Sequence, residues 1–344
     1  MGLQIGEIIP KKQIEFKDLK NKIIAVDAFN AIYQFLTTIR QPDGTPLKDS
    51  KGNVTSHLSG LFYRNMNLIL EGVKLIYVFD GEAPDLKEKT WKKRKEARRE
   101  MKEKYEKAKS EEDIEAMGKY ARFETKLDEE KIKESKELLE AMGIAVVQAP
   151  GEGEAQASVM VKEDSDIYAV ASQDYDCLVF QSPRLIQNLG MARKRKTISG
   201  YVEIFPQLIE LKNVLKELDI NQEQLICLGV LCGTDYNPGG VKGLGPKKSL
   251  AIVKEFKTKE KIFDAIGKDK LEKYEINFEW KEIYDEIEKP KVKKMKKQDI
   301  EFPKIDKDKI KKILLRHDFS EERINNQLLK LDEVKKAKAQ KTLF

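Results

Sequence analysis

The stretch DIYAVASQDYDCLVF, residues 166–180, decides the fold class. It begins with small and β-branched apolar residues from Ile167 to Ala171, a run that is typical of a strand buried on both faces of a parallel sheet. Two carboxylates, Asp174 and Asp176, follow where such a strand would end. Because Asp-x-Asp pairs are also common in turns, the meaning of this pair depends on whether the rest of the chain repeats the arrangement.

Three other stretches are built in the same way. They are KIIAVDA (22–28), KLIYVFDG (74–81) and GIAVVQAPG (143–151), and helical patterns such as EAQASVMVKE (154–163) lie between such runs. This alternation predicts an α/β fold with a mostly parallel central sheet flanked by helices.

The composition narrows the class of protein. The chain has 344 residues with 40% hydrophobic and 36% charged residues, and a net charge of +6. Its three cysteines form no Cys-x-x-Cys pair, which argues against a zinc site and against a disulfide framework and suits a reducing cytoplasm. The first residues lack the pattern of a signal peptide, and no apolar run is long enough to span a membrane.

The predicted strands deliver acidic residues to one edge of the sheet. The carboxyl edge of a parallel sheet is where the sites of α/β proteins form, and a further carboxylate lies in a Gly-rich loop. The seven acidic residues are Asp27, Asp80, Glu152, Glu154, Asp174, Asp176 and Asp235.

A shared cation explains this set better than chance does. Each Asp alone more often forms a turn or a helix cap, but many carboxylates in one cleft repel each other and need a counter-charge. Oxygen ligands without His or Cys suit Mg²⁺, with Mn²⁺ as a substitute. The number of carboxylates suggests two ions, an arrangement that can generate a hydroxide nucleophile and stabilise the leaving oxygen of a phosphodiester.

Residues 81–143 form an insertion that is too long for a simple crossover. From Lys87 to Lys109 it holds 12 basic and 5 acidic residues in a helical pattern with few apolar anchors. Such a helix can be an ordinary solvated face. Because it leaves the sheet directly after Asp80, we expect a basic flap over the acidic site, which suits an anionic polymer such as DNA.

The stretch GTDYNPGGVKGLGPKKS, residues 233–249, joins two predicted helices. It fails the P-loop pattern and the dinucleotide-binding pattern. Gly243 and Gly245 would let a phosphate approach the N-terminus of the second helix, with Lys242, Lys247 and Lys248 adding charge. A tight turn without a ligand is the alternative.

The stretches VDAFNAIYQFL, YVFDG, APGEGEAQAS, SQDYDCLVF and GTDYNPGGVKGLGPKK together resemble the flap endonuclease family of structure-specific 5′ nucleases, in its archaeal form. The similarity runs from residue 1 to about residue 335. It implies a single nuclease core (1–330) with a helical arch or gateway (about 81–143), a helix–two-turn–helix (about 225–256) and a basic tail (331–344).

The resemblance also implies roles for single residues. The seven acidic residues above match the metal ligands of the family. Lys87 and Arg94 match basic residues near the scissile phosphate, Tyr33 matches an aromatic residue that stacks on a base, and Gly2 matches a glycine beside the active site. The helix–two-turn–helix often carries K⁺ in the family.

The tail departs from the family. Members usually end in a peptide that binds the sliding clamp, and only Gln340, Leu343 and Phe344 fit it, since the final aromatic pair is missing. We therefore expect clamp binding to be weakened, or the chain to continue. Gly151, where many members have Ser, is expected to matter little.

The predicted activity is metal-dependent hydrolysis at the base of 5′ flaps, with 5′-3′ exonuclease activity, in DNA replication and repair by a cytoplasmic, nucleoid-associated monomer. One alternative is a related 5′ nuclease for another DNA structure. The other is a DNA-binding protein without catalysis, which would be expected to have lost some of the carboxylates.

Overall fold

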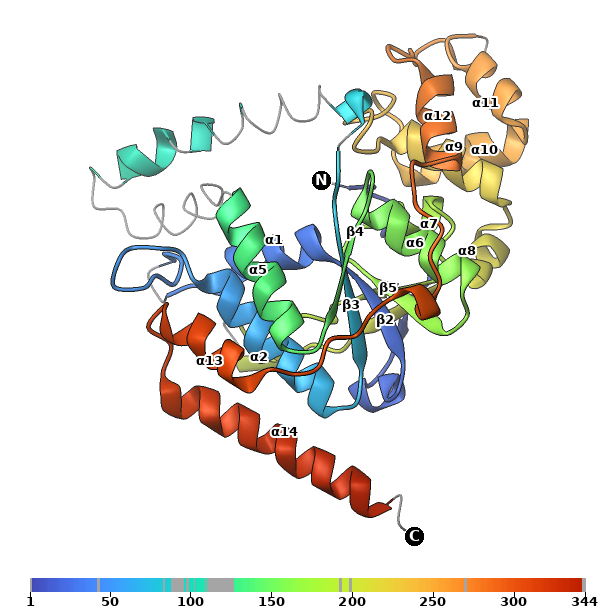
Figure 1. Cartoon of the computed structure of the whole chain (residues 1–344). Helices are drawn as coiled ribbons and strands as arrows, with labels where there is room; N and C mark the ends of the chain where they lie inside the picture. Colours follow the sequence, from blue (N-terminus) through green and yellow to red (C-terminus); the bar gives the residue numbers. More distant parts are fainter. Residues whose placement is uncertain are drawn as a thin grey trace.

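A central sheet lies between two layers of helices in the computed structural model (Figure 1). The structure describes residues 2–41, 44–82, 84–87, 127–191, 194–197, 200–268 and 271–341, with short pieces at 96, 99–101, 103–108 and 110. Side chains at 85, 194–197 and 335–341 lie outside this description. None of the described helices is long and apolar enough to cross a membrane.

The sheet has seven strands, and its centre is parallel as predicted. β6, β5, β2, β3 and β4 run parallel, β9 pairs antiparallel with β6, and β1 pairs antiparallel with β9. In spatial order the strands are β1 (Lys12–Gln13), β9 (Gln207–Glu210), β6 (Arg184–Gln187), β5 (Ile167–Ala171), β2 (Ile23–Asp27), β3 (Lys74–Phe79) and β4 (Ala145–Gln148). A separate hairpin pairs β7 (Lys194–Thr197) with β8 (Gly200–Glu203).

The unbroken apolar runs form the two cores of the molecule. All five residues of β2 are buried. Ile24 and Val26 point into the core on one face of the sheet, and Ile23 and Ala25 point into the core on the other. Because successive side chains of a strand alternate between faces, a strand covered on both sides is apolar along its length, and in β2 the first polar residue is Asp27 at its end.

Helices cover both faces. On one face lie α1 (Ala28–Thr38), α2 (Ser56–Leu70) and α5 (Glu129–Ala141), and on the other lie α6 (Gly153–Glu163), α7 (Asp176–Val179) and α8 (Leu211–Leu218) (Figure 1). A second helical group beside the sheet comprises α9 (Gln222–Cys232), α10 (Pro246–Phe256), α11 (Lys259–Ala265) and α12 (Trp280–Glu288). Short 3₁₀ turns lie at Phe16–Leu19, Asp85–Lys87 and Lys297–Asp299.

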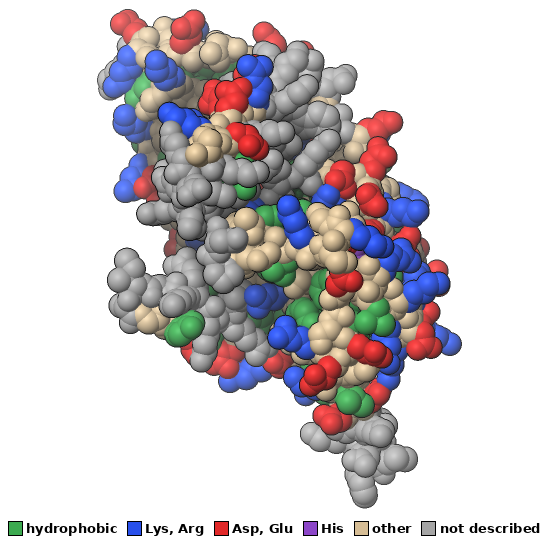
Figure 2. All heavy atoms as spheres, turned by 90° about the vertical axis from the view of Figure 1, so that its left-hand side faces the viewer, with side chains coloured by type: hydrophobic (Ala, Val, Ile, Leu, Met, Phe, Trp, Pro, Cys, Tyr) green, Lys and Arg blue, Asp and Glu red, His purple; other side chains and the backbone are tan. Residues whose placement is uncertain are grey.

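The last two helices pack on the outside of the first layer. α13 (Lys307–Leu315) contacts α5, and α14 (Glu321–Lys341) contacts α2. Ile310, Leu314, Ile324 and Leu328 become buried there, in the same core as β2 and β3. On this side of the molecule Lys and Arg side chains are mixed with Asp and Glu (Figure 2), so neither sign of charge dominates the described part of this face.

Several helices begin with a residue suited to the N-terminus of a helix. The Asp128 side chain accepts a hydrogen bond from Lys131 N at the start of α5, and Ser320 Oγ accepts one from Arg323 N, 3.4 Å away, at the start of α14. The Gly-rich loop enters α10 with Gly245 as N-cap and Pro246 in the first turn, a favourable place for proline. The predicted helix–loop–helix is confirmed as α9 and α10.

Candidate metal-dependent nuclease site

The acidic residues after the strands lie at the starts of the helices that follow. Asp27 ends β2 and caps α1, where its side chain accepts a hydrogen bond from Asn30 N. Glu152 caps α6 and Glu154 lies in its first turn, while Asp176 opens α7 after β5. Because the strands are parallel, these helix starts share one edge of the sheet.

Asp80 joins the end of β3 to the start of α6. Its Oδ1 accepts a hydrogen bond of 2.6 Å from Gly153 N. A Cβ atom on Gly153 would lie 2.7 Å from the same oxygen and 2.9 Å from the carbonyl oxygen of Val78. Glycine at 153 therefore allows the Asp80 carboxylate to approach the N-terminus of α6, where negative charge is favoured.

Two neutral side chains connect further carboxylates. Ser172 Oγ lies 3.3 Å from Asp27 Oδ2 and 3.1 Å from Glu154 Oε1. Asn30 Nδ2 lies 3.4 Å from Asp174 Oδ2. Residues from β2, α1, α6 and the segment after β5 thus meet in one place, as the sequence predicts.

Among the residues that the structure describes, Lys87 places a cation within this acidic group. Its Nζ lies 2.6 Å from Glu152 Oε1 and 3.8 Å from Asp235 Oδ2. The same Nζ lies 5.3 Å from the ring centre of Tyr236, which is buried, within the range of a cation–π contact. The structure therefore places Lys87 and Asp235 beside the strand-end carboxylates.

The loop that carries Asp235 is held by its own hydrogen bonds. Asn237 Oδ1 accepts from both the backbone N and the hydroxyl of Thr234, at 3.0 and 2.8 Å, and Asn237 Nδ2 donates to Val230 O at 2.7 Å. Gly233, with φ of 99°, packs against Gly240 so closely that a Cβ would lie 2.5 Å from its backbone nitrogen. This fixed loop sets the position of Asp235.

The N-terminal segment reaches the same site. Leu3 N donates to Asp176 Oδ2 at 3.3 Å. A Cβ atom on Gly2 would lie 2.1 Å from Asp174 Oδ1 and 2.6 Å from Asp176 Oδ2. The predicted closeness of Gly2 to the site is confirmed.

Burial and mutual repulsion dominate the electrostatics. Burial and the nearby charge of Asp27 raise the pKa of Asp80 to about 7, and burial with the charges of Asp174 and Asp235 raises the pKa of Asp176 to about 8. Burial also raises the pKa of Asp27, and burial together with the charge of Asp27 raises the pKa of Glu154. This is the expected state of carboxylates gathered without enough counter-charge.

Lys87 responds in the opposite direction. Burial alone would lower its pKa, but the carboxylates of Glu152 and Asp235 hold the pKa of Lys87 above its ordinary value. The ammonium group of Lys87 therefore supplies one positive charge to the acidic residues that it contacts.

The donor set fits hard divalent cations. It is made of carboxylate oxygens, which Mg²⁺ and Mn²⁺ prefer, and the raised pKa values mark a site that favours added positive charge. Within the described ranges no three acidic, histidine or cysteine side chains already form a ligand group for a single ion; Ser172, Asn30 and Lys87 lie among the carboxylates instead. The assignment of individual metal ligands stays a prediction.

The predicted DNA-contacting residues lie at the start of α10. Gly243 has φ of 87°, which favours glycine. Lys242, Lys247 and Lys248 are exposed, and Lys248 Nζ donates to Gly243 O at 3.4 Å. Tyr33, the other residue predicted to contact DNA, is half-buried in α1. The contacts of Tyr33 and of the residues before and in α10 with DNA stay predictions.

Part of the predicted site falls outside the described residues. Arg94, most of the arch, Leu343 and Phe344 are not described, and for Gln340 only the backbone in α14 is described. Three neighbours of the carboxylates were not predicted: Ser172, Asn30 and Tyr236. The only sequence feature that could have predicted their place in the site is that each is close in the chain to Asp174, Asp27 or Asp235.

Comparison with known proteins places this arrangement in a family. The family model of the XPG N-terminal domain matches residues 3–101, and that of the XPG I-region matches residues 143–235. Flap endonuclease 1 of Pyrococcus abyssi is 50% identical over 346 residues, covering 100% of this chain and 97% of that protein. Flap endonuclease 1 of Pyrococcus furiosus is 50% identical over 348 residues, covering 100% of this chain and 98% of that one.

The chain belongs to the flap endonuclease 1 family. The predicted resemblance is thereby confirmed, and with it the class of activity, metal-dependent hydrolysis of phosphodiester bonds in DNA. The solved structure of flap endonuclease-1 from Methanococcus jannaschii superposes with a TM-score of 0.74 at 39% identity, covering 98% of this chain and 100% of that chain. The catalytic core of Rad2 in complex with DNA substrate shares the fold at 22% identity and a TM-score of 0.70.

Proposed function

We propose that this member of the flap endonuclease 1 family cuts DNA at the base of 5′ flaps, trims 5′ ends as an exonuclease, and serves DNA replication and repair. The observation that carries the proposal is the meeting of acidic residues from several strand ends with the half-buried Lys87. Asp27, Glu154, Asp174 and Asp176 gather beside Lys87, which binds Glu152.

The seven acidic residues are the proposed ligands of two Mg²⁺ ions, with Mn²⁺ as a substitute. Bound there, divalent cations would supply a hydroxide nucleophile and neutralise charge on the scissile phosphate. The protein would contribute carboxylates that are fixed at the edge of the sheet, and the ammonium group of Lys87. Arg94 is proposed to add a second positive charge at the phosphate, and Tyr33 to stack on a base.

The duplex is proposed to bind at the start of α10. There Gly243, Gly245, Lys242, Lys247 and Lys248 offer backbone N–H groups and exposed ammonium groups, which suit phosphates whatever the base sequence. K⁺ at the helix–two-turn–helix and a weak sliding-clamp contact through the C-terminal tail belong to the same proposal. The protein would act as a monomer in the cytoplasm, at nucleoid DNA.

A single-turnover cleavage assay tests the proposal. Double-flap DNA and a blunt duplex of the same sequence are each incubated with Mg²⁺ or EDTA and with wild type, Asp176→Ala or Asp308→Ala. Asp308 is an exposed residue of α13 and serves as the matched control.

We expect wild type and Asp308→Ala to release the flap as one discrete product with Mg²⁺, and Asp176→Ala to release none. Equal cutting of another branched DNA would indicate a related 5′ nuclease. Tight binding without cutting under every divalent ion would identify a DNA-binding protein without catalysis.

A further inference from the structure

Ser172 occupies a central place among the carboxylates. It is buried, and its Oγ lies within hydrogen-bond distance of Asp27 Oδ2, 3.3 Å, and Glu154 Oε1, 3.1 Å. The backbone N–H of Asp174 donates to the same oxygen at 3.2 Å. The hydroxyl thus connects three acidic residues that come from β2, from α6 and from the segment after β5.

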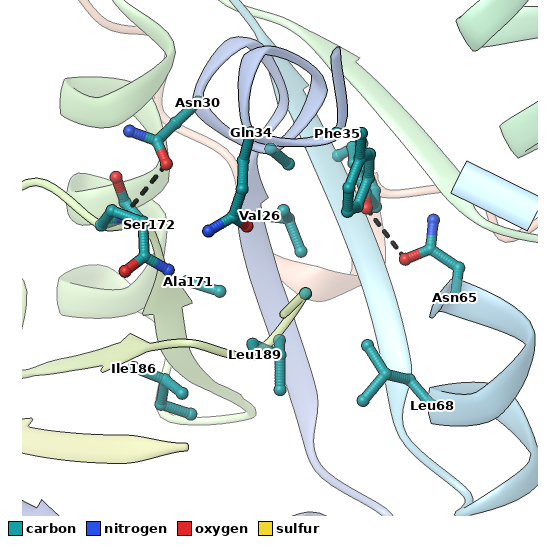
Figure 3. A pocket seen from close by; sticks show the side chains of 14 residues that line it. Val26, Asn30, Gln34, Phe35, Asn65, Leu68, Ala171, Ser172, Ile186 and Leu189 are labelled. Atoms are coloured by element: carbon teal, nitrogen blue, oxygen red, sulfur yellow. Dashed lines mark hydrogen bonds between the residues drawn. The ribbon is translucent and has the colours of Figure 1, made fainter. Parts of the chain in front are cut away.

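Asn30 makes a second connection from α1. Its Nδ2 donates to Asp174 Oδ2 at 3.4 Å, and its Oδ1 accepts from Gln173 N at 3.2 Å. Figure 3 shows the Asn30 side chain directed at the segment that holds Ser172. The two contacts fix the amide orientation, since a flipped amide would place an N–H group against the N–H of Gln173 and an oxygen against a carboxylate.

The backbone of Asn30 belongs to the same connection. Its N–H donates to Asp27 Oδ1 at 3.1 Å. Asn30 therefore contacts two acidic residues through two different groups, while Ser172 contacts the second oxygen of Asp27. Both oxygens of this carboxylate therefore have neutral hydrogen-bond partners, in addition to the neighbouring carboxyl group of Glu154.

We propose that Ser172 and Asn30 are positioning residues, which hold the carboxylates of Asp27, Glu154 and Asp174 in the directions that a divalent cation requires. The inference rests on the proposed function. Without these partners the carboxylates would turn apart, because they repel each other. The free energy needed to bring them back together would then weaken cation binding. Partners that orient metal ligands commonly change metal affinity by about 10- to 100-fold.

The space beside Ser172 supplies a conservative variant. Ser172 and Asn30 line a cavity of about 20 Å³ whose other walls include Val26, Phe35 and Leu68 (Figure 3). A cavity of this size accepts a group as large as a water molecule. Ser172→Thr keeps the hydroxyl and adds one methyl group at a residue that lines this cavity, whereas Ser172→Ala removes the hydroxyl.

The test measures Mn²⁺ binding to the DNA-free protein by electron paramagnetic resonance, beside flap cleavage. We expect Ser172→Ala and Asn30→Leu each to weaken Mn²⁺ binding by about tenfold, and Ser172→Thr to bind within about twofold of wild type. Flap binding in EDTA should be unchanged in all of them. Gln34→Leu, one turn further along α1 and lining the same cavity, is the control and should bind Mn²⁺ like wild type.

The outcomes separate this inference from the proposed function. If wild type binds Mn²⁺ and cuts flaps while Ser172→Ala and Asn30→Leu do both equally well, the positioning role is wrong and the nuclease proposal stands. Loss of binding in Ser172→Thr as large as in Ser172→Ala also contradicts it, because the hydroxyl would not be the cause. If wild type itself neither binds Mn²⁺ nor cuts, both proposals fall.

Discussion

Lys87 is held by the carboxylates that it neutralises. Its ammonium group contacts Glu152 at 2.6 Å and lies over the buried ring of Tyr236. A half-buried lysine with two acidic neighbours stays charged, so it can present a full positive charge to a phosphate group without taking up a proton first.

Removing this charge should slow the chemical step. We expect Lys87→Ala to reduce the single-turnover rate on a 5′ flap by at least about 100-fold, as for other preorganised groups that stabilise transition-state charge. The measurement is quench-flow cleavage at saturating enzyme. Lys312→Ala, at an exposed position of α13, should cut at the wild-type rate, and an unchanged rate in Lys87→Ala would show that the charge is not used.

The buried carboxylates should make the metal-free protein less stable as the pH rises. The folded pKa of Asp80 is about 7, above the ordinary value of about 3.9. A carboxyl group whose pKa is raised by folding binds its proton more tightly in the folded state. Its contribution is complete below about pH 4 and is lost as the pH rises through 7.

Asp80→Asn tests this relation. In EDTA at pH 8 we expect the variant to have a larger free energy of unfolding than wild type by about 1 kcal/mol or more, and the difference to shrink towards pH 4. Guanidinium unfolding at both values is the measurement. A variant less stable than wild type at pH 8 would mean that the Gly153 contact outweighs the repulsion.

Apart from the residues that the family resemblance implied, single residues were predicted from sequence where their chemistry was unusual for their place. Acidic residues at the ends of buried strands stand out, and all seven lie as predicted near the sheet edge or its neighbouring loop. Ser172 and Asn30 are ordinary polar residues in a turn and in a helix. Their role depends on which carboxylates lie opposite, and that is known only when the strands are placed side by side.

At the scale of elements, the site depends on segments that approach closely through glycine. The N-terminal segment lies against Asp174 and Asp176 at Gly2, and the loop before Asp235 folds on itself at Gly233 and Gly240. Such contacts place backbone next to functional side chains with no room for a Cβ atom.

Gly2→Ala should therefore disturb the site more than the fold. The new Cβ would lie only 2.1 Å from Asp174 Oδ1. This is a steric clash, so the carboxylate must move. We expect single-turnover cleavage to fall by at least about tenfold with little change in stability. Gly52→Ala is the reverse control: it meets no atom within 4 Å but has φ of 87°, so it should lose stability and keep the cleavage rate.

Elements were predicted well where a pattern was long and poorly where it was short. The four apolar strands, α6 and the α9–α10 pair follow from periodicity and turn signals. β1, with two residues, and β6 and β9, with four each, were not predicted. β4 is as short as β6 and β9 but lies in a longer apolar run, whereas β6 and β9 have polar residues at both ends and are defined by pairing with the sheet.

At the scale of the whole molecule, polar contacts connect distant parts of the chain. His317, after α13, lies 3.1 Å from Asp49 Oδ2 through Nδ1 and 2.8 Å from Glu134 Oε1 through Nε2. Glu134 also lies 3.7 Å from the buried His57 Nε2. The segment before α2, α5 and the C-terminal helices therefore meet at one cluster.

This cluster should make the protein sensitive to acid. Burial would raise the pKa of Asp49, but hydrogen bonds from Asn53 and His317 lower it to about 2. A carboxylate with a lowered folded pKa contributes stability above its ordinary pKa of about 4 and loses it as the pH falls through 2.

Asp49→Asn should accordingly be less stable than wild type at pH 5, with the difference shrinking between pH 4 and pH 2. Urea unfolding across that range is the measurement. Asp308→Asn, at an exposed site, should follow the wild-type curve. Parallel curves for Asp49→Asn and wild type over the whole range would remove Asp49 from the acid response.

The docking of the C-terminal helices also has a consequence for synthesis on the ribosome. α13 and α14 complete the core on the α2 and α5 side with Ile310, Leu314, Ile324 and Leu328. These residues follow α2 and α5 in the chain, so the apolar outer side of α5 stays uncovered while about 170 intervening residues emerge, and that of α2 for longer, at rates of roughly 5–20 residues per second. At these rates the growing chain exposes this apolar surface to chaperones and to neighbouring chains for roughly 10 to 30 seconds, until α13 and α14 have emerged and can pack on it.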